Sequence, residues 1–155
     1  MVRGLQGSSD GTIDSDHVAA TLKHFAGYAG TAGGRNRSPY THGPRYLLDN
    51  EVAPFRYVIR SARPASVMAA FNEVDGLPCH VNPWILTDVL RNRIGFKGLV
   101  VGDYQGIDLV RQYQKIGTSD ADAARMALQA GLQLELPNNF GYKHLPQLIR
   151  EGKVS

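Results

Sequence analysis

Residues 98–104 read Gly-Leu-Val-Val-Gly-Asp-Tyr, a short apolar run that ends in a glycine and an aspartate. A run this short and β-branched, with little polar alternation, is typical of a strand buried on both faces of a parallel sheet. Three other runs have the same character: VAATLKHF at 18–25, ASVMAAF at 65–71 and LQLEL at 132–136. A turn and then a helical pattern follow each run, so the sequence predicts successive strand–helix units.

The segments between these runs carry helix signals. Apolar residues at helical spacing predict four helices, from Pro54 to Ala62, from Asn82 to Gly95, from Ser119 to Gly131 and from Leu145 to Gly152. The Asn-Pro pair at 82–83 and the serine at 119 are suited to cap a helix start, and the glycines at 95 and 131 are suited to end one.

Consecutive strand–helix units occur in two architectures, a doubly wound sheet and a (β/α)8 barrel. A barrel usually needs about 250 residues. This chain has 155 residues, so we expect it to be a piece of a larger protein.

The composition is that of an ordinary globular domain, with 43% hydrophobic and 20% charged residues. A net charge of +3 without a basic cluster argues against nucleic acid as a partner. No stretch approaches the roughly 18 apolar residues of a membrane span, and residues 1–7 carry no secretory apolar segment. Cys79 stands alone, and the five histidines lack metal-ligand spacing. Compartment and oligomeric state stay open.

Polar residues occur where the predicted strands end. The first run ends in Lys23-His24, Asn72 and Asp103 follow the second and third runs, and Glu135 lies in the fourth. Because the carboxyl ends of parallel strands share one edge, where α/β enzymes carry their active sites, we expect these side chains on one rim. Four of them also have a structural interpretation: Asp103 as a helix cap, Lys23 extended into solvent, His24 as a hydrogen-bonded structural histidine, and Glu135 in a salt bridge.

Several longer motifs lie across the whole chain. KHFAGY at 23–28 is followed by GGRN at 33–36, APF at 53–55 and SVMAAFN at 66–72, and the series ends in LVVGDY at 99–104. In this order they resemble the KHF-G-Y, GGR, PPF, SVM-x-x-YN and VVSDY motifs of glycoside hydrolase family 3, the β-glucosidase-like enzymes.

The resemblance implies an α/β fold, a partial (β/α)8 TIM barrel with about four consecutive βα units and parallel strands. Residues 1–155 would form one incomplete domain, the middle-to-late portion of the family's N-terminal barrel. The first part of that barrel and a C-terminal domain are expected outside this chain. The implied reaction is retaining hydrolysis of terminal non-reducing β-linked sugars, with no metal or organic cofactor. The expected partner is a small carbohydrate or β-glycoside, and neither nucleic acid nor a membrane is expected.

The resemblance also implies roles for particular residues. Asp103 matches the family's catalytic nucleophile. The residues expected to bind substrate are Lys23, His24, Arg35, Met68 and Tyr104. Retaining hydrolysis needs a second carboxyl group about 5–5.5 Å from the first. In one branch of the family an Asp-x-His pair after the KHF strand supplies it, but the loop here contains His42 without that pair. We therefore expect the acid/base in a later domain and no turnover by the chain alone.

Three positions depart from the family pattern. Gly102 replaces the usual Ser or Thr before the nucleophile, Phe71 replaces a Tyr, and Gln133 stands where the family commonly has Asp.

Two other functions fit the residues. A Schiff-base aldolase-type barrel would use Lys23 on its strand as the nucleophilic amine. A non-catalytic βα module that binds carbohydrate would need no nucleophile at all.

Overall fold

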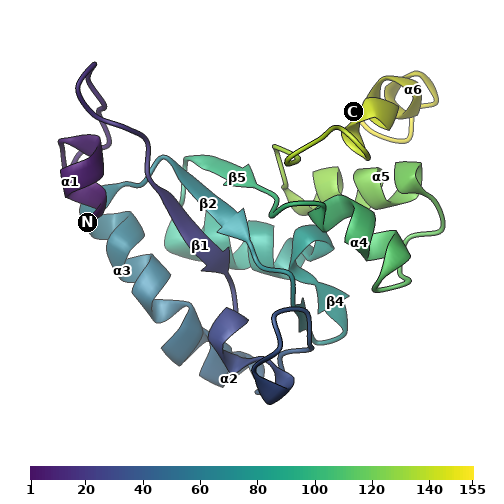
Figure 1. The fold of residues 1–155 in the computed structure, drawn as a ribbon, viewed down its shortest axis with the longest axis horizontal. Helices are drawn as coiled ribbons and strands as arrows, with labels where there is room; N and C mark the ends of the chain where they lie inside the picture. The colour runs from purple at the N-terminus through teal and green to yellow at the C-terminus, as the bar shows by residue number, and fades with distance from the viewer.

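Three short strands form the central sheet of the computed structural model, which describes residues 1–155 (Figure 1). They are β1 (Thr21–Phe25), β2 (Ser66–Ala69) and β5 (Leu99–Val101), all parallel and in the order β1-β2-β5. Ser66 pairs with Thr21 on one side and with Leu99 on the other. The order in the sheet follows the order in the chain, as it does in a (β/α)8 barrel. The predicted parallel α/β fold is confirmed, as part of a barrel with an open sheet.

The fourth predicted strand, residues 132–136, is reduced to one parallel bridge between Leu134 and Val101. The Gln133 and Leu134 N–H groups donate to the Val100 carbonyl at 2.9 and 3.2 Å. The segment therefore lies beside β5, where the prediction places it, but the prediction of a full strand is wrong. Strand β5 itself ends at Val101, which leaves no longer ladder for the segment to join.

All four predicted helices are present. They are α3 (Ala53–Ala62), η5 (Trp84–Ile94), α5 (Asp120–Ala130) and α6 (Leu145–Arg150). The Ile85 N–H donates to the Asn82 Oδ1 atom at 3.2 Å. The Asp122 N–H donates to the Ser119 Oγ atom at 3.1 Å, so both predicted caps are confirmed. Helix α5 ends at Gly131, where a φ of +103° favours glycine.

The structure adds short elements that the periodicity did not predict. They are α1 (Val2–Gln6), η1 (Tyr28–Gly30), η2 (Ala32–Gly34), α2 (Pro44–Tyr46), η3 (Leu47–Glu51), β3 (Glu73–Val74), β4 (Leu77–Pro78), η4 (Cys79–Val81), α4 (Gly106–Gln112) and η6 (Tyr142–His144). Most are too short to show a hydrophobic period. Strands β3 and β4 form an antiparallel hairpin in the crossover between β2 and β5.

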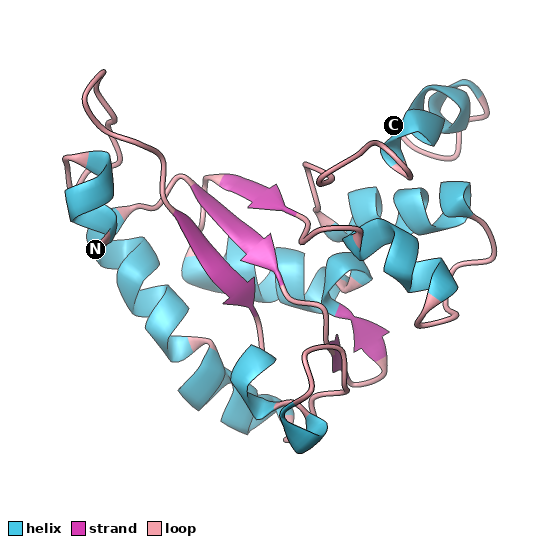
Figure 2. Ribbon diagram, viewed as in Figure 1, coloured by secondary structure: helices cyan, strands magenta, loops and turns pink.

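Helices cover one face of the sheet, and the other face carries no helix of this chain (Figure 2). Val67 of the central strand β2 and Val100 of β5 belong to a single apolar core with Ile59 of α3 and with Leu86 and Leu90 of η5. Burying these side chains is the main driving force for this packing. No helix is long and apolar enough to cross a membrane.

Candidate active site

Asp103 directly follows the carboxyl end of β5, and hydrogen bonds fix the backbone around it. The Gly102 N–H donates to the Leu134 carbonyl at 2.8 Å. The Asp103 N–H donates to Nε2 of His80 at 2.9 Å, and the Tyr104 N–H donates to Oδ1 of Asp103 at 2.7 Å. The Asp103 side chain is 16% exposed. Its carboxylate is therefore held at the rim of the sheet, within reach of a ligand.

His24, near the end of β1, faces this carboxylate. Its Nε2 atom lies 3.3 Å from Oδ2 of Asp103, and its side chain is 21% exposed. Burial lowers the pKa of His24, although the Asp103 carboxylate acts to raise it and Lys23 acts to lower it. The peptide bonds Lys23–His24 and Phe25–Ala26 are cis. The predicted juxtaposition of position 103 with the end of β1 is thus present in the structure at His24.

A hollow of about 380 Å³ lies beside Lys23 and His24, and Asp103 is not among the residues that line it. It is lined by Lys23, His24, Tyr28 and Glu51, with Pro54 and Phe55 on its apolar side. The His24 and Tyr28 rings are tilted against each other with centroids 5.1 Å apart. Ammonium, imidazole and phenol groups are hydrogen-bonding partners for hydroxyl-rich ligands, and the tyrosine ring adds an amphipathic surface.

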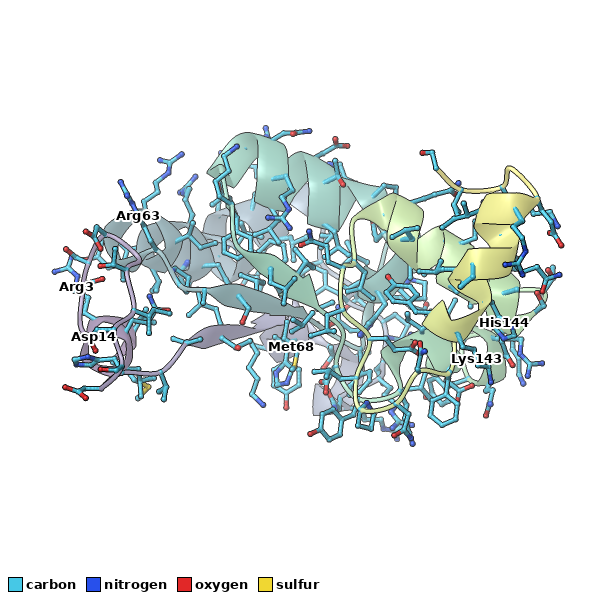
Figure 3. The ribbon with its side chains drawn as sticks, turned by 90° about the horizontal axis from the view of Figure 1, so that it is seen from above. Arg3, Asp14, Arg63, Met68, Lys143 and His144 are labelled. Carbon is cyan, nitrogen blue, oxygen red and sulfur yellow. The ribbon has the colours of Figure 1, made fainter.

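The other predicted substrate residues are dispersed. Met68 is half-buried on β2 and projects from the sheet face opposite helix η5 (Figure 3). Tyr104 adjoins Asp103 and is 60% exposed. Arg35 is exposed in the loop after η2 and makes no ion pair or side-chain hydrogen bond with Asp103. The structure therefore pairs His24 with Asp103, places Lys23 beside His24, and leaves Arg35 apart from them.

Asn72 and Glu135, which the strand-end pattern placed on the same rim, have structural roles. Asn72 is fully buried, and its Nδ2 donates to the Ala26 carbonyl at 3.1 Å. The Glu135 carboxylate accepts the Gly141 N–H at 2.9 Å and the Tyr142 N–H at 2.8 Å. The expectation of five ligand-facing polar groups is corrected, because the Glu135 carboxylate and the Asn72 amide nitrogen bind backbone, while the buried Oδ1 atom of Asn72 has no hydrogen-bond partner.

His80 is a site residue that the sequence reasoning missed. It lies on η4 and is 1% exposed, yet its ring reaches the backbone of Asp103. Burial lowers its pKa to about 4. His80 lies in the buried crossover between β2 and β5 and not at the end of a predicted strand. The position of polar residues at strand ends therefore could not predict it.

Comparison with known proteins decides the family. Residues 1–155 match the description "Glycosyl hydrolase family 3 N terminal domain" along their whole length. The chain belongs to glycosyl hydrolase family 3.

Family 3 relatives and solved structures are similar over nearly the entire chain. A β-xylosidase of Formosa agariphila is 34% identical over 136 residues, which are 88% of this chain and 19% of that protein. A β-glucosidase structure from Erythrobacter marinus superposes with a TM-score of 0.94 at 40% identity, covering 99% of this chain and 20% of that one. A Listeria innocua β-glucosidase in complex with isofagomine gives a TM-score of 0.92 at 32% identity, covering 100% and 22%. The chain thus spans about a fifth of these proteins' length.

The residues that depart from the family 3 pattern have defined surroundings. The Phe71 ring stacks on His80, with centroids 5.7 Å apart. The Arg37 guanidinium lies 5.3 Å from the Phe71 ring centre and 5.8 Å from that of Tyr113. These contacts join three segments that lie far apart in the sequence, around residues 37, 71 and 113.

Gln133, at the other end of the strands, has a purely structural environment. Its Oε1 accepts from Nη2 of Arg91 at 2.6 Å and from the Val100 N–H at 3.0 Å. Arg91 also donates to the carbonyls of Phe96 and Gly98. The Gln133 side chain, which stands where the family commonly has Asp, therefore stabilises the structure at the amino ends of the strands.

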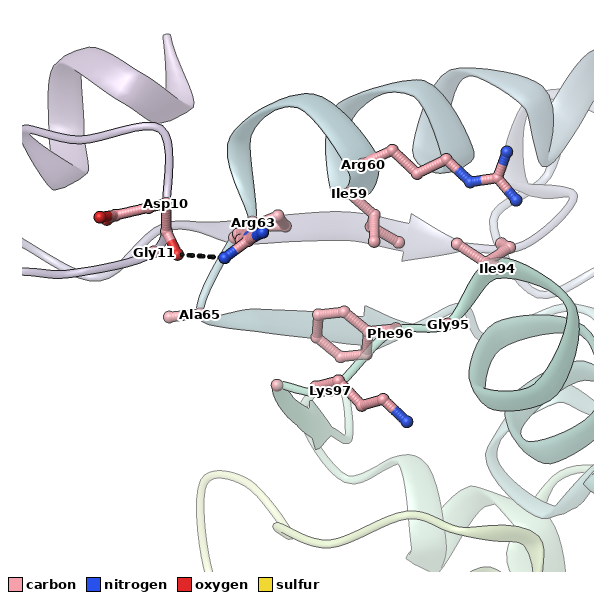
Figure 4. Close-up of a pocket in the computed structure, with 12 residues that line it drawn as sticks. Asp10, Gly11, Ile59, Arg60, Arg63, Ala65, Ile94, Gly95, Phe96 and Lys97 are labelled. Atoms are coloured by element: carbon pink, nitrogen blue, oxygen red, sulfur yellow. Dashed lines mark hydrogen bonds between the residues drawn. The ribbon is translucent and has the colours of Figure 1, made fainter.

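The largest hollow, about 530 Å³, also lies at the amino ends of the strands (Figure 4). Arg60, Arg63 and Lys97 line it with Asp10, and Nη1 of Arg63 donates to the Asp10 carbonyl at 3.2 Å. The Arg60 and Lys97 side chains point away from Arg63, so the cations do not converge on one point (Figure 4). The chain contains no group of three or more His, Cys, Asp or Glu side chains that could hold a metal ion.

Proposed function

We propose that this chain supplies the nucleophile of a retaining β-glycosidase that releases terminal, non-reducing β-linked sugars. The observation that carries the proposal is the pairing of Asp103 and His24 at 3.3 Å on one rim of a family 3 N-terminal domain. Names of similar proteins, β-glucosidases and a β-xylosidase, support a β-glucoside or β-xyloside as substrate.

In the proposed reaction an oxygen of Asp103 attacks the anomeric carbon of the sugar. The bond to the leaving oxygen breaks as an acid protonates that oxygen, and a glycosyl ester of Asp103 forms. Water then attacks the same carbon, its proton passes to the conjugate base, and the Asp103 carboxylate is released. Oδ1 already accepts the Tyr104 N–H, so the carboxylate meets the sugar in one fixed orientation.

Lys23 and His24 are proposed to bind sugar hydroxyls beside the attacked carbon. Burial favours the neutral imidazole of His24, which can donate one hydrogen bond and accept another. Hydrogen bonds that shorten as the sugar approaches its oxocarbenium-like transition state raise kcat instead of merely tightening binding. Met68 and Tyr104 are proposed as apolar and aromatic contacts of the sugar, and Arg35 as a residue of the loop near it.

The acid/base is proposed to come from outside residues 1–155. Glu135 is occupied by backbone N–H donors, so its carboxylate is unsuited to deliver a proton to substrate. One edge of β1 has no strand partner and one face of the sheet has no covering helix, which supports assigning the chain to an incomplete barrel. We therefore expect no hydrolysis of an aryl β-glucoside by the isolated 155-residue chain.

The Schiff-base alternative is less well supported. A nucleophilic lysine is usually activated by desolvation or by a neighbouring cation. Lys23 is exposed, and the hollow that it lines also carries the Glu51 carboxyl group.

Covalent trapping tests the proposal. The natural-length polypeptide that contains this chain is treated with a 2-deoxy-2-fluoro-β-glucosyl fluoride and with its xylosyl analogue, then digested and analysed by mass spectrometry. We expect one adduct, on Asp103, and none in an Asp103→Asn variant. Asp108→Asn, which removes a carboxylate on α4 that only accepts from Gln112, is the matched control and should label normally. An adduct on another carboxylate would contradict the assignment.

A further inference from the structure

The backbone N–H of Asp103 is bound by a side chain and not by a neighbouring strand. Strand β5 ends at Val101, and backbone bonds to the 132–136 segment flank Asp103 on both sides: the Gly102 N–H donates to the Leu134 carbonyl and the Gln105 N–H donates to the Leu136 carbonyl, both at 2.8 Å. The Asp103 N–H itself donates to Nε2 of His80 at 2.9 Å. His80 comes from the crossover between β2 and β5, so the position of Asp103 depends on a residue 23 positions earlier.

The His80 ring has almost no freedom to move. It is 1% exposed and stacks on Phe71 with an interplanar angle of 29°. On its other side lies Gly106, the first residue of α4, where a built Cβ atom would overlap Nε2 of His80. Glycine at 106 therefore makes the space that lets the ring reach Asp103.

The hydrogen bond requires an acceptor. Nε2 accepts from a backbone N–H, so the ring proton sits on Nδ1 and the imidazole is neutral. Burial favours this neutral form. Without such an acceptor, the Asp103 N–H would lose its protein partner, although the neighbouring N–H groups of Gly102 and Gln105 would keep theirs.

We propose that His80 is a positioning residue for this enzyme: its neutral Nε2 fixes the Asp103 peptide and so aims the carboxylate at the anomeric carbon. The inference rests on the proposed function and deepens it, because it assigns a reaction role to a residue that touches no substrate. A misplacement of about 1 Å in an attacking group can cost about 100-fold in rate. Loss of the His80 acceptor should therefore slow formation of the glycosyl-enzyme while sugar binding changes little.

Two amide variants separate the acceptor from the rest of the ring. In His80→Gln the amide oxygen can occupy the place of Nε2. In His80→Asn the side chain is one methylene shorter and cannot reach the Asp103 N–H. The measurement is the rate of fluorosugar adduct formation on Asp103 in the natural-length polypeptide, per folded active site. We expect His80→Asn to slow the maximal trapping rate by about 10- to 100-fold with a nearly unchanged half-saturation concentration. His80→Gln should stay within about threefold of the wild type, because it retains the acceptor.

The control separates positioning from stability. Gln133→Ala removes two hydrogen bonds at the opposite end of the strands, so it should lower the melting temperature and leave the trapping rate per folded site unchanged. If His80→Asn fails to fold, Gly106→Ala provides the second test. It keeps His80 and Asp103 but pushes the ring away from the Asp103 N–H. The same slow trapping is expected.

Two results would overturn the positioning role: trapping at the wild-type rate in folded His80→Asn or Gly106→Ala, or equal slowing in the Asn and Gln variants. Failure of the proposed function looks different, because wild-type protein would then form no adduct on Asp103 with either fluorosugar.

Discussion

Acidification should loosen the segment around Asp103 through His80. The folded protein holds this imidazole neutral, with a pKa of about 4, whereas the same group has an ordinary pKa of 6.5 once the segment opens. Between these two values the opened form binds a proton that the closed form does not. By linkage, the closed form is fully favoured above pH 6.5 and loses stability as the pH falls towards 4.

The magnitude follows from the same two pKa values. From pH 7 to pH 5 the free energy of opening should fall by about 2 kcal/mol, which is about a 20-fold rise in the open population. The direction is reinforced by His24, whose pKa burial also lowers.

Amide hydrogen exchange of a peptide spanning residues 99–106 measures this population. The assay compares the natural-length polypeptide at pH 7 and pH 5, with exchange times corrected for the intrinsic pH dependence of exchange. The protection of this peptide should decrease by about 20-fold in the wild type and by much less in His80→Gln, which has no titrating group at this position. Equal pH dependence in the two proteins, or none in the wild type, would refute the reasoning.

Three further predictions concern single side chains. Glu135→Gln should keep turnover in the natural-length enzyme within a few-fold of wild type, since Glu135 fixes backbone; loss of activity restored by azide would instead identify it as the acid/base. Ser119→Ala should destabilise the protein by about 1 kcal/mol, because the Asp122 N–H loses its cap; an unchanged midpoint in urea denaturation would contradict this. Gln133→Asp places a carboxylate opposite the Arg91 guanidinium, and the pair should bring the melting temperature to at least the wild-type value in thermal denaturation. A lower melting temperature would show that the shorter side chain no longer reaches both of its partners.

The sequence was sufficient to predict that the strands are parallel and to locate the four helices that have clear hydrophobic spacing and capping residues. Ser119 and Asn82 cap their helices as predicted because capping depends on local hydrogen bonds. The segment 132–136 has a strand-like composition but forms only a bridge, because its pairing depends on where β5 ends. Composition contains no information on the length of a partner strand.

In the candidate site, too, some features were predictable from the local sequence and others depend on contacts that only the fold creates. Strand-end position was enough to bring His24 and Asp103 together, since parallel strands share an edge. It also selected Asn72 and Glu135, whose hydrogen-bond partners only the folded backbone reveals. His80 escaped because its role depends on the space at Gly106, a contact across 26 residues of chain.

The stacking of Arg37 on Phe71 and Tyr113 has a consequence for protein engineering. The three side chains belong to different loops. A chimaera that exchanges one of these loops therefore loses the cation–π contacts that Arg37 makes with the two aromatic rings. Grafts of these loops should therefore transfer all three segments together. The same coupling predicts that substitutions at these positions are inherited together.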